Sequence, residues 1–201
     1  MTVLVVYKVN NGVGATTLAE EIARALLPRG HPVYLVDASV AHPSLSLKYY
    51  PEDACGWLSE ALGRPACGCR PAPQVKLEYT LVSGTDASRL YLGMCGRAQK
   101  GVTEAIAHAL SVYLAKKRGK SYTVVDLDLW VAAKALKEHI LIYVDDYRLS
   151  KPTIQQIEAA KLARIVVVTK TAVRPKLAHY LVPTKEDVKR VAREIVSLVP
   201  P

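Results

Sequence analysis

The chain has 201 residues, half of them apolar and 22% charged. That balance supports one domain with a buried core and excludes intrinsic disorder, while 11 glycines and 12 prolines exclude collagen-like or linker material. No window reaches about 18 consecutive apolar residues, so we expect no transmembrane helix. The apolar run 3–7 has no basic stretch before it, which favours a first strand over a signal peptide. We expect one soluble, cytoplasmic domain over residues 1–201.

The formal net charge of +9 favours an anionic partner such as a nucleotide, a nucleic acid or a membrane surface. The lysine-rich surface of a thermophilic protein explains the same charge equally well. Asparagine occurs only at Asn10 and Asn11, methionine occurs twice and phenylalanine is absent, a composition typical of thermophilic proteins. This bears on the four cysteines, because intracellular disulfides are found in hyperthermophiles.

Apolar runs rich in valine and leucine alternate with helical patterns along the chain. We predict strands over 2–8, 32–37, 77–82, 121–127, 139–145, 163–169 and 179–182, and helices over 14–27, 53–62, 98–118, 129–138, 150–161 and 184–199. Strands such as 33–36 and 165–168 are apolar on both faces, as central parallel strands are. The alternation predicts an α/β fold, a Rossmann-like three-layer sandwich with a mostly parallel central sheet.

A glycine turn follows the first predicted strand and opens the first predicted helix. A helix N-terminus presents free backbone N–H groups and the positive end of the helix dipole, which together attract anions. Gly12 and Gly14 allow the backbone to wrap closely around a phosphate, and the Thr16 hydroxyl is of the kind that binds Mg²⁺. The turn therefore predicts a phosphate site.

This turn resembles that of the ParA/MinD family of deviant Walker A ATPases, in the SIMIBI class of P-loop proteins, whose loop reads K-G-G-V-G-K-T-T. On that pattern the chain reads Asn10, Asn11, Gly12, Val13, Gly14, Ala15, Thr16 and Thr17. The resemblance implies a P-loop NTPase-like fold in which these eight residues bind ATP or ADP together with Mg²⁺.

Further segments resemble the same family in the same order. The resemblance implies that Asp37, which ends the second predicted strand, is catalytic because it organises magnesium and the attacking water. Residues 122–126 resemble the Walker B strand, so Thr16, Asp37 and Asp126 are the implied magnesium residues. The positions of the adenine contacts correspond to Thr169, Lys170 and Pro183.

Two lysines of the family loop are missing from this chain. Ala15 stands where a lysine holds the β- and γ-phosphates, and Asn10 stands where the signature lysine reaches the nucleotide of a dimer partner. Losing such a charge costs on the order of 2–4 kcal/mol of transition-state stabilisation. We expect Lys8 to point to a sheet face rather than to the phosphates. The loop either binds nucleotide weakly with very slow hydrolysis, or it binds none.

The cysteines lie within 55–95, around a loop predicted over 63–76 that holds three prolines. Three interpretations stay open. Cys55 or Cys95 forms a disulfide with one of the pair Cys67 and Cys69, or that pair binds a metal at a dimer interface, or the thiols are free.

Basic residues gather on the polar side of the last predicted helix. They are Lys185, Lys189, Arg190 and Arg193. Similar patches bind DNA nonspecifically in ParA-like proteins, so we predict a homodimer that binds DNA and a small DNA-binding partner protein, in partition or positioning. The alternatives are a catalytically inactive adaptor or scaffold, and a metal-centre assembly factor that uses Cys67 and Cys69.

Overall fold

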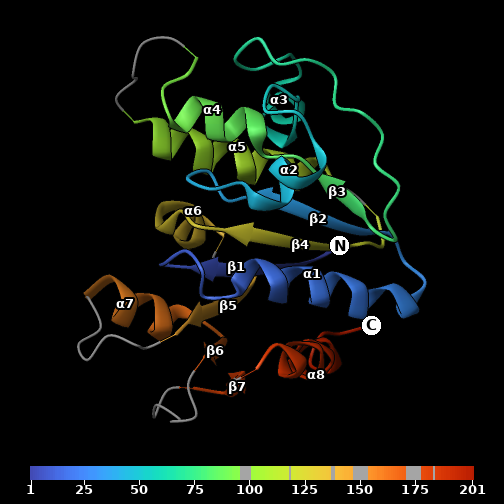
Figure 1. Ribbon diagram of the computed structural model, residues 1–201, viewed down its shortest axis with the longest axis vertical. Helices are drawn as coiled ribbons and strands as arrows, with labels where there is room; N and C mark the ends of the chain where they lie inside the picture. Colours follow the sequence, from blue (N-terminus) through green and yellow to red (C-terminus); the bar gives the residue numbers. More distant parts are fainter. Residues whose placement is uncertain (96–100, 118, 137–138, 147–153, 171–177, 183) are drawn as a thin grey trace.

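The computed structural model describes the chain except for residues 96–100, 118, 137–138, 147–153, 171–177 and 183. Seven parallel strands form one sheet in the order β3-β2-β4-β1-β5-β6-β7, with helices on both of its faces (Figure 1). The strands are β1 (Thr2–Lys8), β2 (Val33–Ala38), β3 (Thr80–Val82), β4 (Tyr122–Leu127), β5 (Ile140–Asp145), β6 (Ile165–Thr169) and β7 (Tyr180–Val182).

The helices include two short ones between β2 and β3. They are α1 (Ala15–Leu26) with a 3₁₀ turn η1 (Leu27–Arg29), α2 (Ser44–Tyr49), α3 (Trp57–Leu62), α4 (Thr85–Tyr91), α5 (Val102–Lys116), α6 (Trp130–Ala135), α7 (Ile154–Leu162) and α8 (Lys185–Ser197). Among the described residues, no helix is long and apolar enough to cross a membrane.

The central strands form because both of their faces are covered. In β1, Val3, Val5 and Tyr7 enter one core, whereas Leu4 and Val6 enter the other. The second core lies beneath α1 and α8, which pack against each other, and the first lies beneath α3, α5, α6 and α7. Because of this alternation, a residue at the end of a strand faces the same side of the sheet as every second residue before it.

All seven predicted strands are present, and the α/β fold with a parallel sheet is confirmed. The helices α2 and α4 were not predicted. Each has six or seven residues, and α4 buries a polar side through Asp86 and Ser88, so it lacks an apolar stripe at helical spacing. Part of three predicted helices, at 98–100 and 118, at 137–138 and at 150–153, falls outside the described residues.

Two disulfides tie the segment between α2 and α5 together. They join Cys55 to Cys69 and Cys67 to Cys95, so no described cysteine is free. The prediction of a metal at Cys67 and Cys69 is therefore wrong, because a metal is bound by thiolates and both sulfur atoms are oxidised. The loop predicted over 63–76 has no helix or strand, and Arg70 holds it to residues 53–55 through backbone hydrogen bonds.

Candidate functional site

The turn after β1 has the backbone shape of a phosphate loop. Gly12 and Gly14 adopt φ values of 77° and 87°, a left-handed region that side chains rarely enter. Gly14 is the residue before α1, and no side chain caps this helix. The first-turn N–H groups of α1 are therefore available to an anion.

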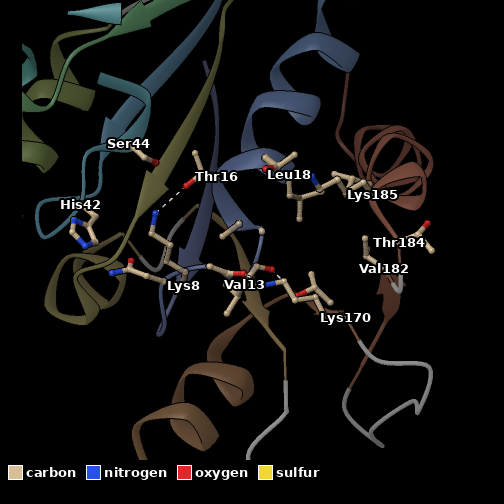
Figure 2. Close-up of a pocket in the computed structure, with 17 residues that line it drawn as sticks. Lys8, Val13, Thr16, Leu18, His42, Ser44, Lys170, Val182, Thr184 and Lys185 are labelled. Carbon is tan, nitrogen blue, oxygen red and sulfur yellow. Dashed lines mark hydrogen bonds between the residues drawn. The ribbon is translucent and has the colours of Figure 1, made fainter. Parts of the chain in front are cut away.

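A pocket of about 660 Å³ opens over this turn at the carboxyl ends of the strands (Figure 2). Its walls come from the turn, the first turn of α1, the end of β6 and the start of α8. Three lysines line it, Lys8, Lys170 and Lys185, and the described lining residues include no aspartate or glutamate. The apolar side chains Val182 and Val188 close one side. The pocket thus has lysines on several of its walls and an apolar side.

Lys8 lies at the centre of a buried polar cluster beneath the turn. Its Nζ lies 3.0 Å from Thr16 Oγ1 and 3.3 Å from both carboxylate oxygens of Asp126. The Thr16 hydroxyl donates to Asp126 Oδ2 at 2.7 Å. Lys8 is 4% exposed and Asp126 is fully buried, so this ion pair is shielded from solvent. Figure 2 shows the Lys8 side chain pointing toward Thr16.

Lys8 lies on a sheet face, as expected, and the strand geometry shows which face it is. Lys8 shares the face of Leu4 and Val6, which α1 covers, and it lies just past their core. On β4, Asp126 alternates in the same way with Tyr122 and Val124, so it faces the same side. The end of β1 therefore places Lys8 under the first turn of α1.

Burial raises the pKa of the Asp126 carboxyl above its usual value. The Lys8 ammonium beside it and the Thr16 hydroxyl oppose that shift. An unpaired charge at such depth costs several kcal/mol, so the ammonium is the group that allows a carboxylate here. The Lys8 ammonium and the Asp126 carboxylate thus neutralise each other within the cluster.

Asp37 has different surroundings, although it is in register with Asp126 across β2 and β4. Its Oδ2 accepts hydrogen bonds from Ser46 N at 2.7 Å and Ser46 Oγ at 2.8 Å, and its Oδ1 accepts one from Ser39 N at 3.3 Å. Trp57 Nε1 donates to its backbone carbonyl. Burial, and next the Asp126 carboxyl, raise the pKa of Asp37 to about 7. Asp37 is thus enclosed by its own segment and does not line the pocket.

A third carboxylate that the sequence analysis did not single out supports the same segment. Asp128 accepts hydrogen bonds from Val40 N at 2.9 Å, Ala41 N at 3.0 Å and Ser39 Oγ at 3.2 Å. It holds the connection from β2 to α2 against the end of β4. A strand-end aspartate that binds successive backbone N–H groups is a local positioning device.

The residues implied for magnesium do not fit a magnesium ion as they are placed. Mg²⁺ binds oxygen ligands in octahedral geometry and keeps several waters. Here an ammonium is bonded to Thr16 and Asp126, and these two side chains are bonded to each other. Asp37 bonds to Ser46 instead of turning toward Thr16. The position that a metal would need is next to a fixed positive charge.

The pocket gathers most of the residues that the resemblance implies for nucleotide. Those that line it are Asn11, Gly12, Val13, Gly14, Ala15, Thr16, Thr17, Thr169 and Lys170. Asn10 is exposed and does not line it, and Pro183 lies outside the described residues. Thr169 Oγ1 donates to the Val13 carbonyl at 2.5 Å, and Lys170 Nζ donates to the Gly12 carbonyl. These two contacts tie the end of β6 to the turn.

Several lining residues were not assigned to the nucleotide site from the sequence, and Lys185 among them was assigned to DNA instead. They are Lys8, Leu18, His42, Ser44, Val182, Thr184, Lys185 and Val188. A lysine that ends an otherwise apolar strand is a signal for Lys8, since such a charge needs a buried partner. Leu18 directly follows Thr17 in α1, and the other six come from segments that only the folded sheet brings to the turn.

The basic side of α8 is exposed, whereas its apolar side packs on α1. Arg190 makes ion pairs with Asp187 at 3.2 Å and with Glu194 at 2.8 Å. Lys189 and Arg193 are exposed to solvent, and Arg193 Nε donates to the Lys189 carbonyl. Lys185 faces the pocket. The helix therefore leaves Lys189 and Arg193 as its outward cations.

The parallel sheet and the glycine turn that opens α1 define a P-loop NTPase-like α/β protein. Scans against protein-family models and curated proteins found no match. Among solved structures, the fold is similar to a plasmid partition protein from Borrelia burgdorferi, with 13% identity, a TM-score of 0.58 and coverage of 98% of this chain and 99% of that one.

Two further solved structures have the same fold. A ParA family ATPase from Chlorobium tepidum is 13% identical, with a TM-score of 0.52 and coverage of 100% of this chain and 92% of that one. Cobyrinic acid a,c-diamide synthase from Mycobacterium smegmatis, with bound ADP and magnesium, is 18% identical, with a TM-score of 0.53 and coverage of 100% and 86%. The chain thus has the ParA/MinD-like fold.

Proposed function

We propose that this protein is a ParA/MinD-like protein that binds ATP or ADP in the pocket over its glycine turn. The observation that carries the proposal is the combination of left-handed Gly12 and Gly14, an uncapped α1 and three lining lysines without a described acidic neighbour in the lining. Such a site attracts a polyphosphate, and the apolar side formed by Val182 and Val188 suits a base. The mycobacterial structure of this fold carries ADP and magnesium.

Hydrolysis by this site is very slow or absent. Ala15 is a buried apolar residue in the position of the phosphate-gripping lysine, and Asn10 lies outside the pocket lining. Asp37, the catalytic residue implied by the resemblance, already accepts two hydrogen bonds from Ser46. Loss of one such charge costs roughly two to three decades of rate.

The binding form is a cytoplasmic homodimer that acts in DNA partition or positioning with a small DNA-binding partner protein. Support comes from the fold shared with the two bacterial proteins of ParA and plasmid-partition description, and from the net charge of +9. Lys185, Lys189, Arg190 and Arg193 form the surface that meets DNA, with Lys189 and Arg193 contributing most because Arg190 is paired with acids. A thermophilic origin fits both the composition and the two disulfides.

The nucleotide proposal is tested by isothermal titration calorimetry with ATP and with ADP. We expect saturable binding, which Lys185→Glu weakens by about tenfold because a carboxylate replaces a lining cation. Lys161→Glu makes the same charge change on the exposed side of α7 and should leave binding unchanged. Equal effects of the two variants would show that the nucleotide binds elsewhere.

The DNA proposal is tested by gel-shift titration on a nonspecific duplex across a range of salt concentrations. We expect binding that weakens steeply with salt, because counterions are released from the phosphates. Removing the outward cations with Lys189→Ala and Arg193→Ala should lower the slope of log K against log salt by about two. No binding at low salt would reject this part of the proposal.

A second candidate function is that of a catalytically inactive adaptor or scaffold that binds neither nucleotide nor DNA. It is favoured by Ala15 in place of the loop lysine and by the enclosure of Asp37. Calorimetry separates the two candidates, because micromolar binding of ATP or ADP is incompatible with the scaffold.

A further inference from the structure

The cluster beneath the turn contains a cation that belongs to the protein itself. Lys8 Nζ contacts the helix-start hydroxyl of Thr16 and both carboxylate oxygens of Asp126. In a phosphate-loop site, a hydroxyl at this helix position and a carboxylate at the end of the neighbouring strand are the groups that hold Mg²⁺. Here both groups point at an ammonium.

The ammonium is held as firmly as a bound ion. Its side chain is 5% exposed, and the carboxylate that neutralises it is fully buried. The 3.3 Å contacts to the two Asp126 oxygens can share one N–H, and a second N–H serves Thr16. Lys8 also lines the pocket, so its third N–H is available to a phosphate oxygen.

A divalent ion at the same oxygens would lie against this ammonium. Like charges at that distance repel strongly inside a protein, where the effective dielectric is low. Neither Thr16 nor Asp126 can turn to a metal without losing a bond to Lys8, and Asp37 is held by Ser46. The site therefore admits one cation, and Lys8 is already there.

We propose that the Lys8 ammonium takes the place of the magnesium ion of a phosphate-loop site, so that this protein binds nucleoside di- and triphosphates without a divalent metal. This inference rests on the proposed nucleotide function and specifies the form of the ligand, which is the metal-free polyphosphate. Lys170 and Lys185 at the pocket supply further positive charge to the phosphates.

The test measures ATP affinity of the full chain by calorimetry, once with excess magnesium and once with EDTA. We expect binding in EDTA that is at least as tight as binding with magnesium, because the bound species is the metal-free polyphosphate and excess magnesium draws ATP into a complex that the site does not admit. Binding that weakens by about tenfold or more in EDTA overturns the inference and leaves the proposed function standing. Binding in neither buffer overturns the proposed function and this inference with it.

A variant supplies the converse test. Lys8→Met shortens the side chain by only one atom and removes its charge, which frees Thr16 and Asp126 for a metal. We expect this variant to bind ATP about tenfold more tightly with magnesium than with EDTA, and to broaden the electron paramagnetic resonance of Mn²⁺ beyond that of Mn²⁺ and ATP without protein. Lys161→Met, a change at an exposed lysine on α7, should bind ATP in the two buffers as the wild-type protein does.

The wild-type comparison in the two buffers needs no folded variant, so it decides the inference even where Lys8→Met fails to fold. A Lys8→Met variant that folds and remains independent of metal would contradict the assignment. Wild-type protein that broadens the Mn²⁺ signal in the presence of ATP as strongly as the variant would contradict it as well.

Discussion

At the carboxyl edge of the sheet, two buried aspartates are satisfied by different kinds of partner, one on the side of β2 and the other on the side of β1. Asp37 and Asp126 are in register on neighbouring strands, and both are fully buried. On the β2 side, the amides and the hydroxyl of Ser39 and Ser46 satisfy the Asp37 carboxylate, and Trp57, two residues after the disulfide-bonded Cys55, donates to the Asp37 carbonyl. On the β1 side, a lysine beside an open pocket neutralises Asp126. Register alone does not assign a role to a carboxylate, because its partners decide it.

The difference is sharpest in what each side leaves for a ligand. The Asp37 side ends in a closed network, in which Asp86 also accepts from Gly56 N, Ser59 N and Ser59 Oγ. The Asp126 side ends beneath free backbone N–H groups and a cation. We infer that the first side is scaffold and that the second is the working site.

The largest expected effect comes from removing the cation of the open side. Lys8→Met leaves the Asp126 carboxylate buried without a partner, which should lower the free energy of unfolding by about 3–5 kcal/mol. Urea denaturation at neutral pH measures this loss. The double variant Lys8→Met with Asp126→Asn removes the unpaired charge and should recover most of the stability. Equal stability of the single and double variants would contradict the ion pair.

The next effect concerns the closed side and depends on pH. The pKa of Asp37 is raised to about 7 in the folded protein, so the folded state favours the protonated carboxyl. The associated stability is fully present below the ordinary aspartate pKa and is lost as the pH rises toward 7, at about 1.4 kcal/mol per pH unit. Asp37→Asn cannot titrate, so its stability should decline less between about pH 4 and 7, the window that separates the two pKa values. Parallel pH profiles of the two proteins would contradict the shifted pKa.

The disulfides test whether the two sides are independent. Cys55→Ala with Cys69→Ala opens a bridge between residues 14 apart, which should cost about 3 kcal/mol of stability in the chain-entropy account. Thermal unfolding measures the loss. Because no cysteine lines the pocket over the turn, the affinity for ATP should not change. A weakened affinity would show that the scaffold side shapes the site.

The smallest effect adds charge to the open side. Ala15→Lys places an ammonium at the first residue of α1, which lines the pocket, and should tighten ATP binding by about 1.5–3 kcal/mol. Ala15→Met matches its bulk without charge and serves as the control. Hydrolysis should recover less, since Asn10 still lacks the lysine that reaches a dimer partner. Undetectable ATP binding by Ala15→Lys would favour the scaffold function.

The sequence was sufficient for the strands, because short runs such as 33–36 are apolar on both faces, are rich in β-branched residues and alternate with helical patterns, as central strands of a parallel sheet do. It was insufficient for α4, whose buried Asp86 bonds to a segment about 30 residues away, a pairing that no local pattern encodes. The glycine turn was recognised from spacing alone, and its left-handed glycines agree with that interpretation.

The ion pair between Lys8 and Asp126 was not predicted from the sequence. Counting alternate residues from Leu4 would have placed Lys8 on the face beneath α1, together with Asp126 on its own strand. What the count cannot supply is the pairing of β1 with β4, which comes from residues more than 100 positions apart. The choice between a free lysine and a buried ion pair depends on that pairing.

The indole of Trp57 gives the protein an optical reporter of its own. The ring is fully buried, donates its N–H to the Asp37 carbonyl and lies 6.5 Å from the ring of Tyr113. Trp130, the second tryptophan of the sequence, instead lies 5.3 Å from the ring of Tyr7 on β1. The emission of Trp57 thus follows the closed side of the sheet edge, while that of Trp130 follows the strand that carries Lys8. The fluorescence of the protein is the sum of the two emissions, and replacing one tryptophan with phenylalanine leaves the emission of the other.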